Sequence, residues 1–487
     1  MRYAVAIVLI VVLSPFSGIV SGEYEQDRIE NSESSSIMES YSIPVQLAFD
    51  RAEDISRYSQ DEILSTKEWL VVTGIPLNEH TKSLSSPISS IETKVLPGSY
   101  IWEMEDGGKA IESLTKAMEI GEIESFSPVI KMEHTKKFYP NDPEFGSQWH
   151  LENSGQTGGL SGEDANLTGA WDSYNGSGVV ISIVDDGLDV SHPDIAPNYD
   201  QSASYDWCND DSDPTPLSFD GHGTAAAGVA GAAGNNSIYV SGAAFGASLA
   251  GSTLIACSIN DFDESQALSY ENDYIDIYSN SWGPSDTGRI LDGPGPLMTA
   301  AFENDVFQGR DGLGNIITWA AGNGLTNDDD SNYDGYANSR YTIAVTAITH
   351  LGEQSYYAEP GANILVAAHS NGDGEAITTT DIVGSGGYNS SGNVTDTFGG
   401  TSSATPLVSG VIALMLEANQ NLTWRDVQHI LVNTARVNDP SDSSWEINGA
   451  GHDVSHKYGF GAVDASAAVA MSSNWTTVED EVNVSIG

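Results

Sequence analysis

The stretch VVISIVDDGLD, residues 179–189, places five β-branched apolar residues around one serine, and two adjacent aspartates and a glycine follow them. A short apolar run that stops at Asp and Gly is typical of a buried strand. Similar runs recur at 275–283, 315–324 and 341–349, and helical patterns occupy 225–234 and 405–418. Because alternating strands and helices build a parallel sheet, this region is predicted to be α/β with helices on both faces.

The preceding region has a different pattern. Residues 23–63 are polar and rich in Ser, Glu and Asp, and are expected to be loosely ordered. Residues 68–76 and 99–105 are predicted to be strands, and residues 109–120 a helix. We therefore expect a small α+β domain ahead of the large one.

The charge balance is strongly acidic. The 487 residues include 69 Asp and Glu against 18 Lys and Arg, for a formal charge of -51. Nucleic acid is excluded as an expected partner because phosphate binding needs clustered basic side chains. Most of the acidity is interpreted as solvated surface or as a device for solubility in salt. Local clusters of aspartate instead favour Ca²⁺ ligands or pockets for basic substrates.

The N-terminus predicts secretion. Residues 1–22 combine one Arg, an unbroken apolar run from Ala4 to Leu13 and then small residues, which is typical of a signal peptide. No later stretch is long enough for an expected membrane span in the mature chain. Cys208 and Cys257 are the only cysteines, and the sequence leaves open whether they are bonded.

Three predicted strand or helix ends carry reactive side chains. Asp185 ends a strand, His222 begins a helix in DGHGTAAAG, and Ser402 begins another in GGTSSATPLVSG. Each alone is a weak signal, since Gly-Thr-Ser is often only a helix cap. Together they fit a triad in which Ser402 attacks a carbonyl, His222 transfers the proton and Asp185 orients the imidazole. Asn323 is predicted to hold the oxyanion together with the Ser402 N–H.

At this point the sequence resembles the kexin and furin branch of the subtilisin-like serine proteases. The blocks VDDGLD, SNSWGPSDTG, AAGNG, NYDGYANS, GGTSSATP, NLTWRDVQH and VSHKYGFG follow in that family's order. The resemblance implies a subtilisin-like fold and a serine endopeptidase. It also implies a pocket for the basic residue before the scissile bond, lined by Asp286 and Asp334.

The resemblance implies further subsites for basic substrate residues. Asp186 and Asp220 match positions for the second residue, and Glu264 and Asp292 match acidic positions of the fourth subsite. Ser258 and Ser285 stand where furin-like members carry glutamates. A kexin-like preference for a basic pair is therefore expected.

The resemblance also implies a Ca²⁺ cofactor. Three ligand sets carry over from the family, namely Asp142, Asp194 and Asn236; Asp206, Asp211 and Asp213; and, behind the substrate pocket, Asp286, Asp329 and Glu359. Oxygen ligands of this kind suit a hard cation. Without the family resemblance, the run DDSDP would be interpreted as a solvated turn.

Lys136 and Lys137 form the only adjacent basic pair in the chain. Cleavage after Lys137 would release residues 23–137 as a propeptide, which in the family assists folding and inhibits the enzyme. The alternative is a chance pair on the surface. Residues 138–475 are then the catalytic domain, and 476–487 a tail without the family's further β-rich domain.

The predicted function is a secreted, Ca²⁺-dependent serine endopeptidase that cuts proteins or peptides after paired Lys or Arg and is autoprocessed after Lys137. Two alternatives stay open. One is a degradative subtilisin-like protease of broad specificity, and the other is a non-catalytic, Ca²⁺-binding scaffold.

Overall fold

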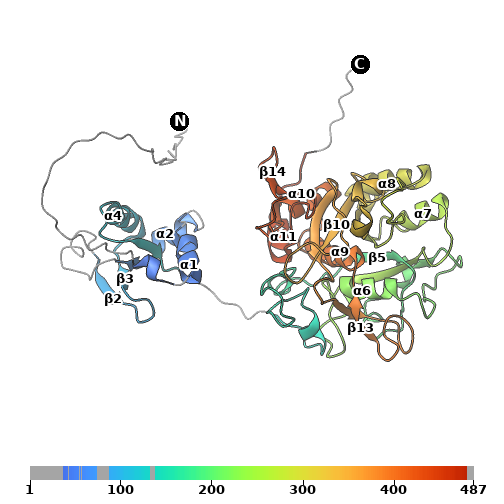
Figure 1. Ribbon diagram of the computed structural model, residues 1–487, viewed down its shortest axis with the longest axis horizontal. Coiled ribbons are helices and arrows are strands. Elements are labelled where there is room, and N and C mark those ends of the chain that lie inside the picture. Colours follow the sequence, from blue (N-terminus) through green and yellow to red (C-terminus); the bar gives the residue numbers. More distant parts are fainter. Residues whose placement is uncertain are drawn as a thin grey trace, which may run out of the picture. The chain divides into compact units, whose positions relative to one another are not determined.

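The computed structural model describes residues 37–41, 43–53, 55, 58–73, 87–131 and 138–479. Contacts divide the chain into two compact units, residues 1–135 and 136–487 (Figure 1). The division falls close to the predicted end of the propeptide. The predicted signal peptide and the Lys136–Lys137 pair lie outside the described residues.

The first unit contains an antiparallel sheet of four strands, β2-β3-β1-β4. Its strands are β1 (Glu68–Val72), β2 (Ser89–Glu92), β3 (Ser99–Glu103) and β4 (Ser125–Pro128). Helix α4 (Gly107–Glu119) begins after Asp106, whose carboxylate accepts a hydrogen bond from the Lys109 N–H at 3.0 Å. Trp69, Trp102 and Leu114 are fully buried between this helix and the sheet. The predicted strands and helix are therefore present, with ends shifted by a few residues.

The expectation of loose order for residues 23–63 is wrong for the part that the structure describes. This part contains η1 (Met38–Ser40), α1 (Ile43–Glu53) and most of α2 (Gln60–Ser65). Phe49 and Ile63 are buried. Ser59 and Glu62 form a capping box that satisfies backbone N–H groups at the start of α2. A few apolar contacts and one cap are enough to order a segment whose average composition is polar.

The second unit is built on seven parallel strands in the order β11-β10-β9-β8-β5-β7-β6. These strands are β5 (Val180–Asp185), β6 (Tyr205–Asp206), β7 (Ser248–Thr253), β8 (Ile277–Asn280), β9 (Ile316–Ala320), β10 (Thr342–Ile348) and β11 (Ile364–His369). Every residue of β5, β8, β9 and β10 is buried, which explains their continuous rather than alternating apolar pattern. The strand that opened the sequence analysis, β5, lies inside this sheet.

Helices cover the sheet on both faces. In Figure 1, α7 (Asp261–Leu268) and α8 (Pro296–Gln308) lie on one side of β5, and α6 (His222–Gly231) lies on the other. The remaining helices are α5 (Leu167–Ala170), α9 (Thr401–Ala418), α10 (Trp424–Thr434) and α11 (Ala465–Ser472). Short 3-10 helices are η3 (Phe145–Ser147), η4 (Gln201–Ala203), η5 (Arg310–Gly312), η6 (Leu325–Asn327) and η7 (Ser331–Tyr333). Two antiparallel strand pairs lie outside the large sheet, namely β12 (Ile377–Thr380) with β13 (Val394–Phe398) and β14 (Glu446–Ile447) with β15 (Asp453–Val454). The predicted α/β architecture is confirmed.

Helix α9 is the central helix of this unit. It packs against α6 and against β8, β9, β10 and β11. Among the described residues it is the one helix long and apolar enough to cross a membrane, but 83% of that stretch is buried within the fold. Its apolar character is therefore explained by its place in the core.

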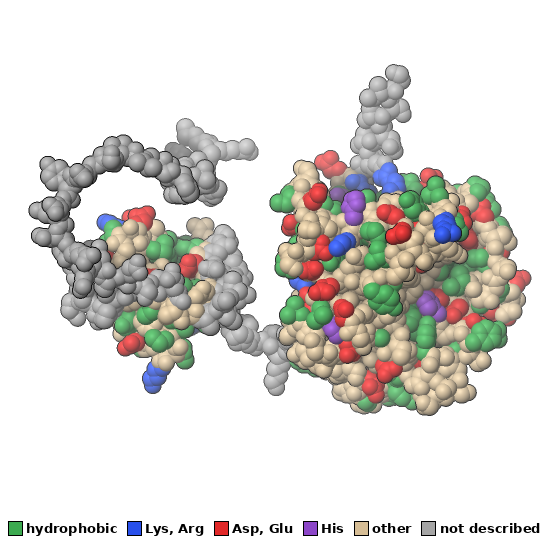
Figure 2. All heavy atoms as spheres, in the orientation of Figure 1, with side chains coloured by type: hydrophobic (Ala, Val, Ile, Leu, Met, Phe, Trp, Pro, Cys, Tyr) green, Lys and Arg blue, Asp and Glu red, His purple; other side chains and the backbone are tan. Residues whose placement is uncertain are grey.

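The acidic composition appears at the surface. Figure 2 shows acidic side chains scattered over the visible face of the second unit, with few basic ones among them. This distribution agrees with the interpretation of most of the charge as solvated surface.

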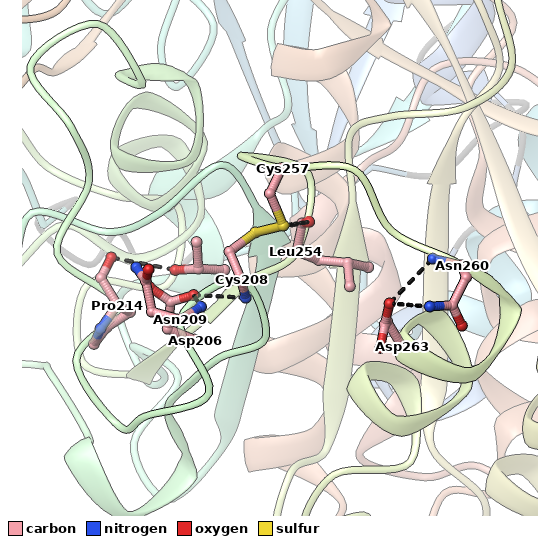
Figure 3. The surroundings of a disulfide bond; sticks show 9 residues. Asp206, Cys208, Asn209, Pro214, Leu254, Cys257, Asn260 and Asp263 are labelled. Carbon is pink, nitrogen blue, oxygen red and sulfur yellow. Dashed lines mark hydrogen bonds between the residues drawn. A yellow bond between two sulfur atoms is a disulfide. The ribbon is translucent and has the colours of Figure 1, made fainter.

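The two cysteines are bonded to each other. Cys208 follows β6 and Cys257 follows β7, with their Cα atoms 5.7 Å apart (Figure 3). The Asp206 carboxylate accepts a hydrogen bond from the Cys208 N–H at 2.8 Å. The disulfide thus ties the acidic loop after β6 to the segment that leads to α7.

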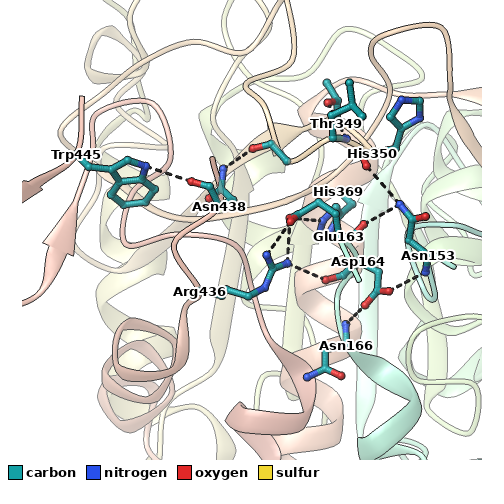
Figure 4. Close-up of polar contacts among 12 residues, drawn as sticks. Asn153, Glu163, Asp164, Asn166, Thr349, His350, His369, Arg436, Asn438 and Trp445 are labelled. Carbon is teal, nitrogen blue, oxygen red and sulfur yellow. Dashed lines mark hydrogen bonds and ion pairs between the residues drawn. The ribbon is translucent and has the colours of Figure 1, made fainter. Parts of the chain in front are cut away.

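A partly buried ion pair joins distant parts of the second unit (Figure 4). Glu163 accepts hydrogen bonds from Arg436 at 2.8 and 3.0 Å and contacts His369 at the end of β11 at 3.2 Å. Burial raises the pKa of Glu163, but these hydrogen bonds and the positive charges outweigh it and hold that pKa at about 2. The sequence analysis did not find this contact because its members lie more than 200 residues apart.

Candidate active site

The candidate acid–base pair sits where β5 ends and α6 begins. Asp185 is 1% exposed, and its two carboxylate oxygens lie 2.9 and 3.0 Å from Nδ1 of His222. The backbone carbonyl of Asp185 accepts hydrogen bonds from the N–H groups of Leu254 and Ile255, which hold the strand end in place. This arrangement orients the imidazole with Nε2 as the other nitrogen available for proton transfer.

The charge around His222 favours the imidazolium. Burial lowers the pKa of His222, but the charge of Asp185, the hydrogen bond to it and the charge of Asp186 raise that pKa to about 9. A positive charge bound next to Asp186 would weaken this effect. The basicity of His222 therefore depends on what occupies the neighbouring acidic position.

Ser402 occupies the first turn of α9. Gly400, with φ of 76°, turns the chain into the helix, and this left-handed conformation favours glycine. Pro406 has no N–H to donate to the Ser402 carbonyl, which instead accepts a hydrogen bond from the Ser281 hydroxyl at 3.1 Å. Ser281 was not identified from the sequence, although it directly follows β8.

Among the described residues, no hydrogen bond joins the Ser402 hydroxyl to His222. Its Oγ donates to the Ser281 carbonyl at 3.3 Å. Such hydrogen bonds are often absent or long without substrate and form when the reacting carbonyl arrives.

Asn323 faces the start of α9. Its Oδ1 accepts hydrogen bonds from Thr401, at 2.8 Å from the N–H and 3.1 Å from the hydroxyl. This fixes the amide orientation and leaves the Nδ2 group without a partner among the described residues. The Ser402 N–H lies in the first helical turn, where backbone donors have no intrahelical acceptor. Two donors are thus available for an oxyanion beside Ser402. Thr401, which sets the amide orientation, was missed in the sequence analysis.

A pocket of about 230 Å³ joins the nucleophile to two of the predicted aspartates. Its lining residues include Ser402 and Asn323 together with Asp286 and Asp334. Gly283 makes room for one of them, because a Cβ there would lie 2.8 Å from Asp334 Oδ2. The structure therefore brings the predicted substrate carboxylates into the cavity next to the candidate nucleophile.

Both carboxylates are held in surroundings that disfavour their charge. Burial, followed by the charges of Asp286 and Asp292, raises the pKa of Asp334 to about 7, against hydrogen bonds from backbone N–H groups. Burial and the charge of Asp329 raise the pKa of Asp286, whose Oδ2 accepts a hydrogen bond from the Asn323 N–H at 2.8 Å. A cation in the pocket would relieve this cost.

The remaining predicted subsite residues flank this region. Asp186 accepts hydrogen bonds from the N–H groups of His222 and Gly223, and burial with the Asp185 charge raises the pKa of Asp186 to about 7. Asp220 lies just before α6 with one carboxylate oxygen buried and unpartnered among the described residues. Both acids therefore adjoin the helix that carries His222.

The predicted fourth-subsite acids also meet in the structure. Glu264 on α7 accepts a hydrogen bond from the Tyr336 hydroxyl at 2.8 Å, and burial and nearby charges, including that of Asp292, raise its pKa. Asp292 pairs through its backbone with the segment around Asp334. The ring of Tyr336 stacks on the buried ring of Trp319.

The three predicted calcium sets differ in geometry. Asp142 and Asp194 are buried, and Asn236 bridges them through a hydrogen bond from its N–H to Asp142 and one from its amide to Asp194. Around Gly324, a Cβ would lie within 3 Å of atoms of Asp329, Asp286 and Glu359. Each of these two sets is brought together by the fold.

The third set is arranged more locally. Asp206 accepts hydrogen bonds from the backbone of Cys208 and Asn209, and Asp211 and Asp213 each accept one from a backbone N–H two residues ahead. Within the described ranges, no three His, Cys, Asp or Glu side chains are already arranged as a metal site. The fit of each set therefore rests on its oxygen chemistry, since Asp211 and Asp213 of the third set are exposed.

Comparison with known proteins agrees with this fold. Residues 176–461 match the model of the subtilase family. The solved serine protease of Aeromonas sobria superposes with a TM-score of 0.66 at 27% identity, covering 72% of this chain and 70% of that one. The chain belongs to the subtilase family.

Curated relatives narrow the assignment within that family. Human proprotein convertase subtilisin/kexin type 6 is 44% identical over 351 residues, human furin is 41% identical over 346, and the PC3-like endoprotease variant B of Hydra vulgaris is 43% identical over 345. These alignments cover 70%, 70% and 69% of this chain and 35%, 42% and 48% of the relatives. The resemblance to the kexin and furin branch is confirmed. The chain matches between a third and a half of the length of these relatives.

Proposed function

We propose that this chain is a secreted, Ca²⁺-dependent serine endopeptidase that hydrolyses proteins or peptides after paired basic residues. The observation that carries the proposal is the pocket that Ser402 and Asn323 share with Asp286 and Asp334. A lysine or arginine side chain entering this pocket would meet two carboxylates while its backbone carbonyl lies beside the nucleophile.

The proposed mechanism uses the residues around that carbonyl. The Ser402 hydroxyl attacks it while His222 Nε2 takes the proton, and Asp185 stabilises the imidazolium that forms. The Asn323 amide and the Ser402 N–H donate to the developing oxyanion. His222 returns the proton to the leaving amine, and water then repeats the sequence on the acyl-enzyme.

The preference for a basic pair rests on the second acidic position. Asp186 lies against the backbone of His222, and Asp220 has an unpartnered buried oxygen. A cationic side chain at this position would satisfy both. It would also reduce the negative charge near His222 and so bring its pKa toward the range useful for a base. Glu264 and Asp292 would accept a further basic residue.

Calcium is proposed for the three acidic sets named above. The set around Gly324 supports this best, because burial, together with the charges of Asp286, Asp329 and Asp334, raises the pKa of Glu359 to about 8, against a hydrogen bond from Gly324. The ion would supply charge compensation behind the substrate pocket and would join loops of the catalytic unit. We route no step of the hydrolysis through it.

The N-terminal unit is proposed to be the propeptide, released by cleavage after Lys137. The chain would enter the secretory pathway through its signal peptide. Substrates with basic residues and the propeptide itself are the proposed partners. These assignments rest on the sequence and the family, since the signal peptide and the Lys136–Lys137 pair lie outside the described residues.

Three experiments test the proposal. The first compares Lys-Arg and Phe-Leu peptide reporters with and without a calcium chelator, and equal rates on both reporters would favour a degradative protease of broad specificity. The second expresses the wild type beside Ser402→Ala and sequences the N-termini. The wild type is expected to begin at Phe138 and the variant to stay uncut. Labelling by a serine-directed phosphonate excludes a non-catalytic scaffold.

A further inference from the structure

Phe138, the residue that follows Lys137, lies in a preformed site on the catalytic unit. Its backbone N–H donates to Oδ1 of Asp172 at 2.9 Å. Its ring stacks on Phe245, with centroids 5.5 Å apart and an interplanar angle of 24°, and meets the edge of Trp171 at 6.5 Å. We call Asp172, Trp171 and Phe245 the N-terminal seat.

The seat rests on the main core, since Trp171 belongs to that core and Phe245 packs against it. Trp171 is 5% exposed, and its Nε1 donates to the Ala243 carbonyl at 2.8 Å. Phe245 packs on Trp171 at 5.6 Å between ring centroids. The Gly246 N–H next to it donates to the Asn175 carbonyl. These contacts hold the seat independently of Phe138.

Asp172 is the polar part of the seat. Its side chain is solvent-accessible, and across the described ranges its one recorded hydrogen bond comes from the Phe138 N–H. One neutral donor leaves most of the hydrogen-bonding capacity of a carboxylate to water. The position is therefore able to accept a group with more donors and a positive charge.

Hydrolysis after Lys137 would create that group at this nitrogen. The bond between the Lys137 carbonyl carbon and the Phe138 nitrogen breaks, and water supplies a hydroxyl to the carbon and a hydrogen to the nitrogen. The amine then takes a proton from solvent, since α-amino groups have a pKa of about 8. A single N–H donor becomes an ammonium with three donors.

We propose that the new α-ammonium of Phe138 pairs with Asp172 while its ring fills the N-terminal seat, so that cleavage locks the mature N-terminus onto the catalytic unit. The inference rests on the proposed cleavage after Lys137 and adds a binding site for its product. The pocket beside Ser402 contains none of the residues of the seat.

The test uses the full chain in four versions. Ser402→Ala, with and without Asp172→Asn, is measured uncut and after cutting by a lysine-specific protease. Lys457 is the only lysine beyond Lys137, and in the structure it pairs with Asp442 at 2.7 Å. Cutting by an outside protease makes the test independent of the chain's own activity, so failure of the seat and failure of the proposed function are distinguishable.

At pH 7 we expect Asp172→Asn to lower the Tm of the cut protein by about 1–3 °C and that of the uncut protein by less than half as much. The pairing raises the pKa of the α-ammonium, so its stabilisation is present below about pH 8 and is lost as the pH rises through that raised value. At pH 10 the cut and uncut proteins should show the same effect.

A second readout follows the amine itself. Acylation of the Phe138 α-amine at pH 7 is measured by mass spectrometry. It should be about threefold slower in the cut protein that keeps Asp172 than in Asp172→Asn, because pairing with Asp172 keeps more of the amine protonated and an ammonium does not react. Glu152→Gln is the matched control, since Glu152 accepts from the Tyr139 hydroxyl rather than from the N-terminus. Equal acylation rates, or equal Tm losses in cut and uncut proteins, would overturn the proposal.

Discussion

Replacing Asp334 by Asn tests whether the pocket beside Ser402 selects a cationic side chain. At about 4 Å, a guanidinium and a carboxylate attract by about 4 kcal/mol at an effective dielectric constant of about 20. Burial, with the charges of Asp286 and Asp292, raises the pKa of Asp334 to about 7, so about half of the empty pockets are neutral at pH 7. This partial protonation reduces the favourable binding free energy of the cation by about 0.4 kcal/mol. We expect kcat/KM for a Lys-Arg reporter to fall by about 100- to 1,000-fold.

The assay compares Lys-Arg and Phe-Leu reporters in wild type and Asp334→Asn at several pH values. Only the basic reporter should lose rate. A protonated Asp334 attracts no cation, so the pocket's advantage is present above pH 7 and declines as the pH falls through that value. The variant should lack this part of the pH profile.

Asp396→Asn is the matched control for the overall field, because it removes one exposed acidic charge outside the pocket. It should leave both reporters nearly unchanged. A comparable loss for the Phe-Leu reporter in Asp334→Asn would show that the substitution damages the site rather than its selectivity. That result would refute the proposed role of Asp334.

Three further outcomes are expected. Asn323→Ala should lower kcat by about 100- to 1,000-fold with KM nearly unchanged, and an equal rise in KM would contradict an oxyanion role. Replacing both Cys208 and Cys257 by Ser should lower the free energy of unfolding by up to about 4 kcal/mol, since the disulfide closes a loop with a separation of 49 residues, and an unchanged denaturant midpoint would contradict this. Burial lowers the pKa of His150 to about 3, and neither ring nitrogen has a partner among the described residues. Below about pH 6.5 the unfolded chain therefore binds a proton at His150 that the folded chain does not bind. The free energy of unfolding should then decline as the pH falls, by about 2 kcal/mol at pH 5. His150→Phe should remove that decline.

Local sequence was sufficient for the strands of the large sheet and for the pairing of Asp185 with His222. Continuous apolar runs mark β5, β8, β9 and β10 because strands of a parallel sheet are buried on both faces. Asp185 and His222 were identifiable because each lies at the end of such an element, and the structure joins them at 2.9 Å. The same reasoning failed for residues 43–53, where a polar average concealed helix α1.

Several features depended on contacts between segments far apart in the chain. Ser281, which holds the Ser402 carbonyl, lies 121 residues away from it. The ion pair of Glu163 with Arg436 spans 273 residues, and Asp172 is 34 residues from Phe138. No local pattern encodes such pairs, because the partners come together only when strands and helices take their places around the sheet.

The sequence by itself determined the sheet-and-helix order and the family, and it predicted which acids hold a cation. Only the tertiary structure decided that Cys208 and Cys257 meet, that Asp286 and Asp334 open into one pocket with Ser402, and that Phe138 rests against Asp172. The reason is physical. Periodicity and residue chemistry are local properties of the chain, whereas burial, charge proximity and hydrogen-bond partners exist only once distant segments share one space.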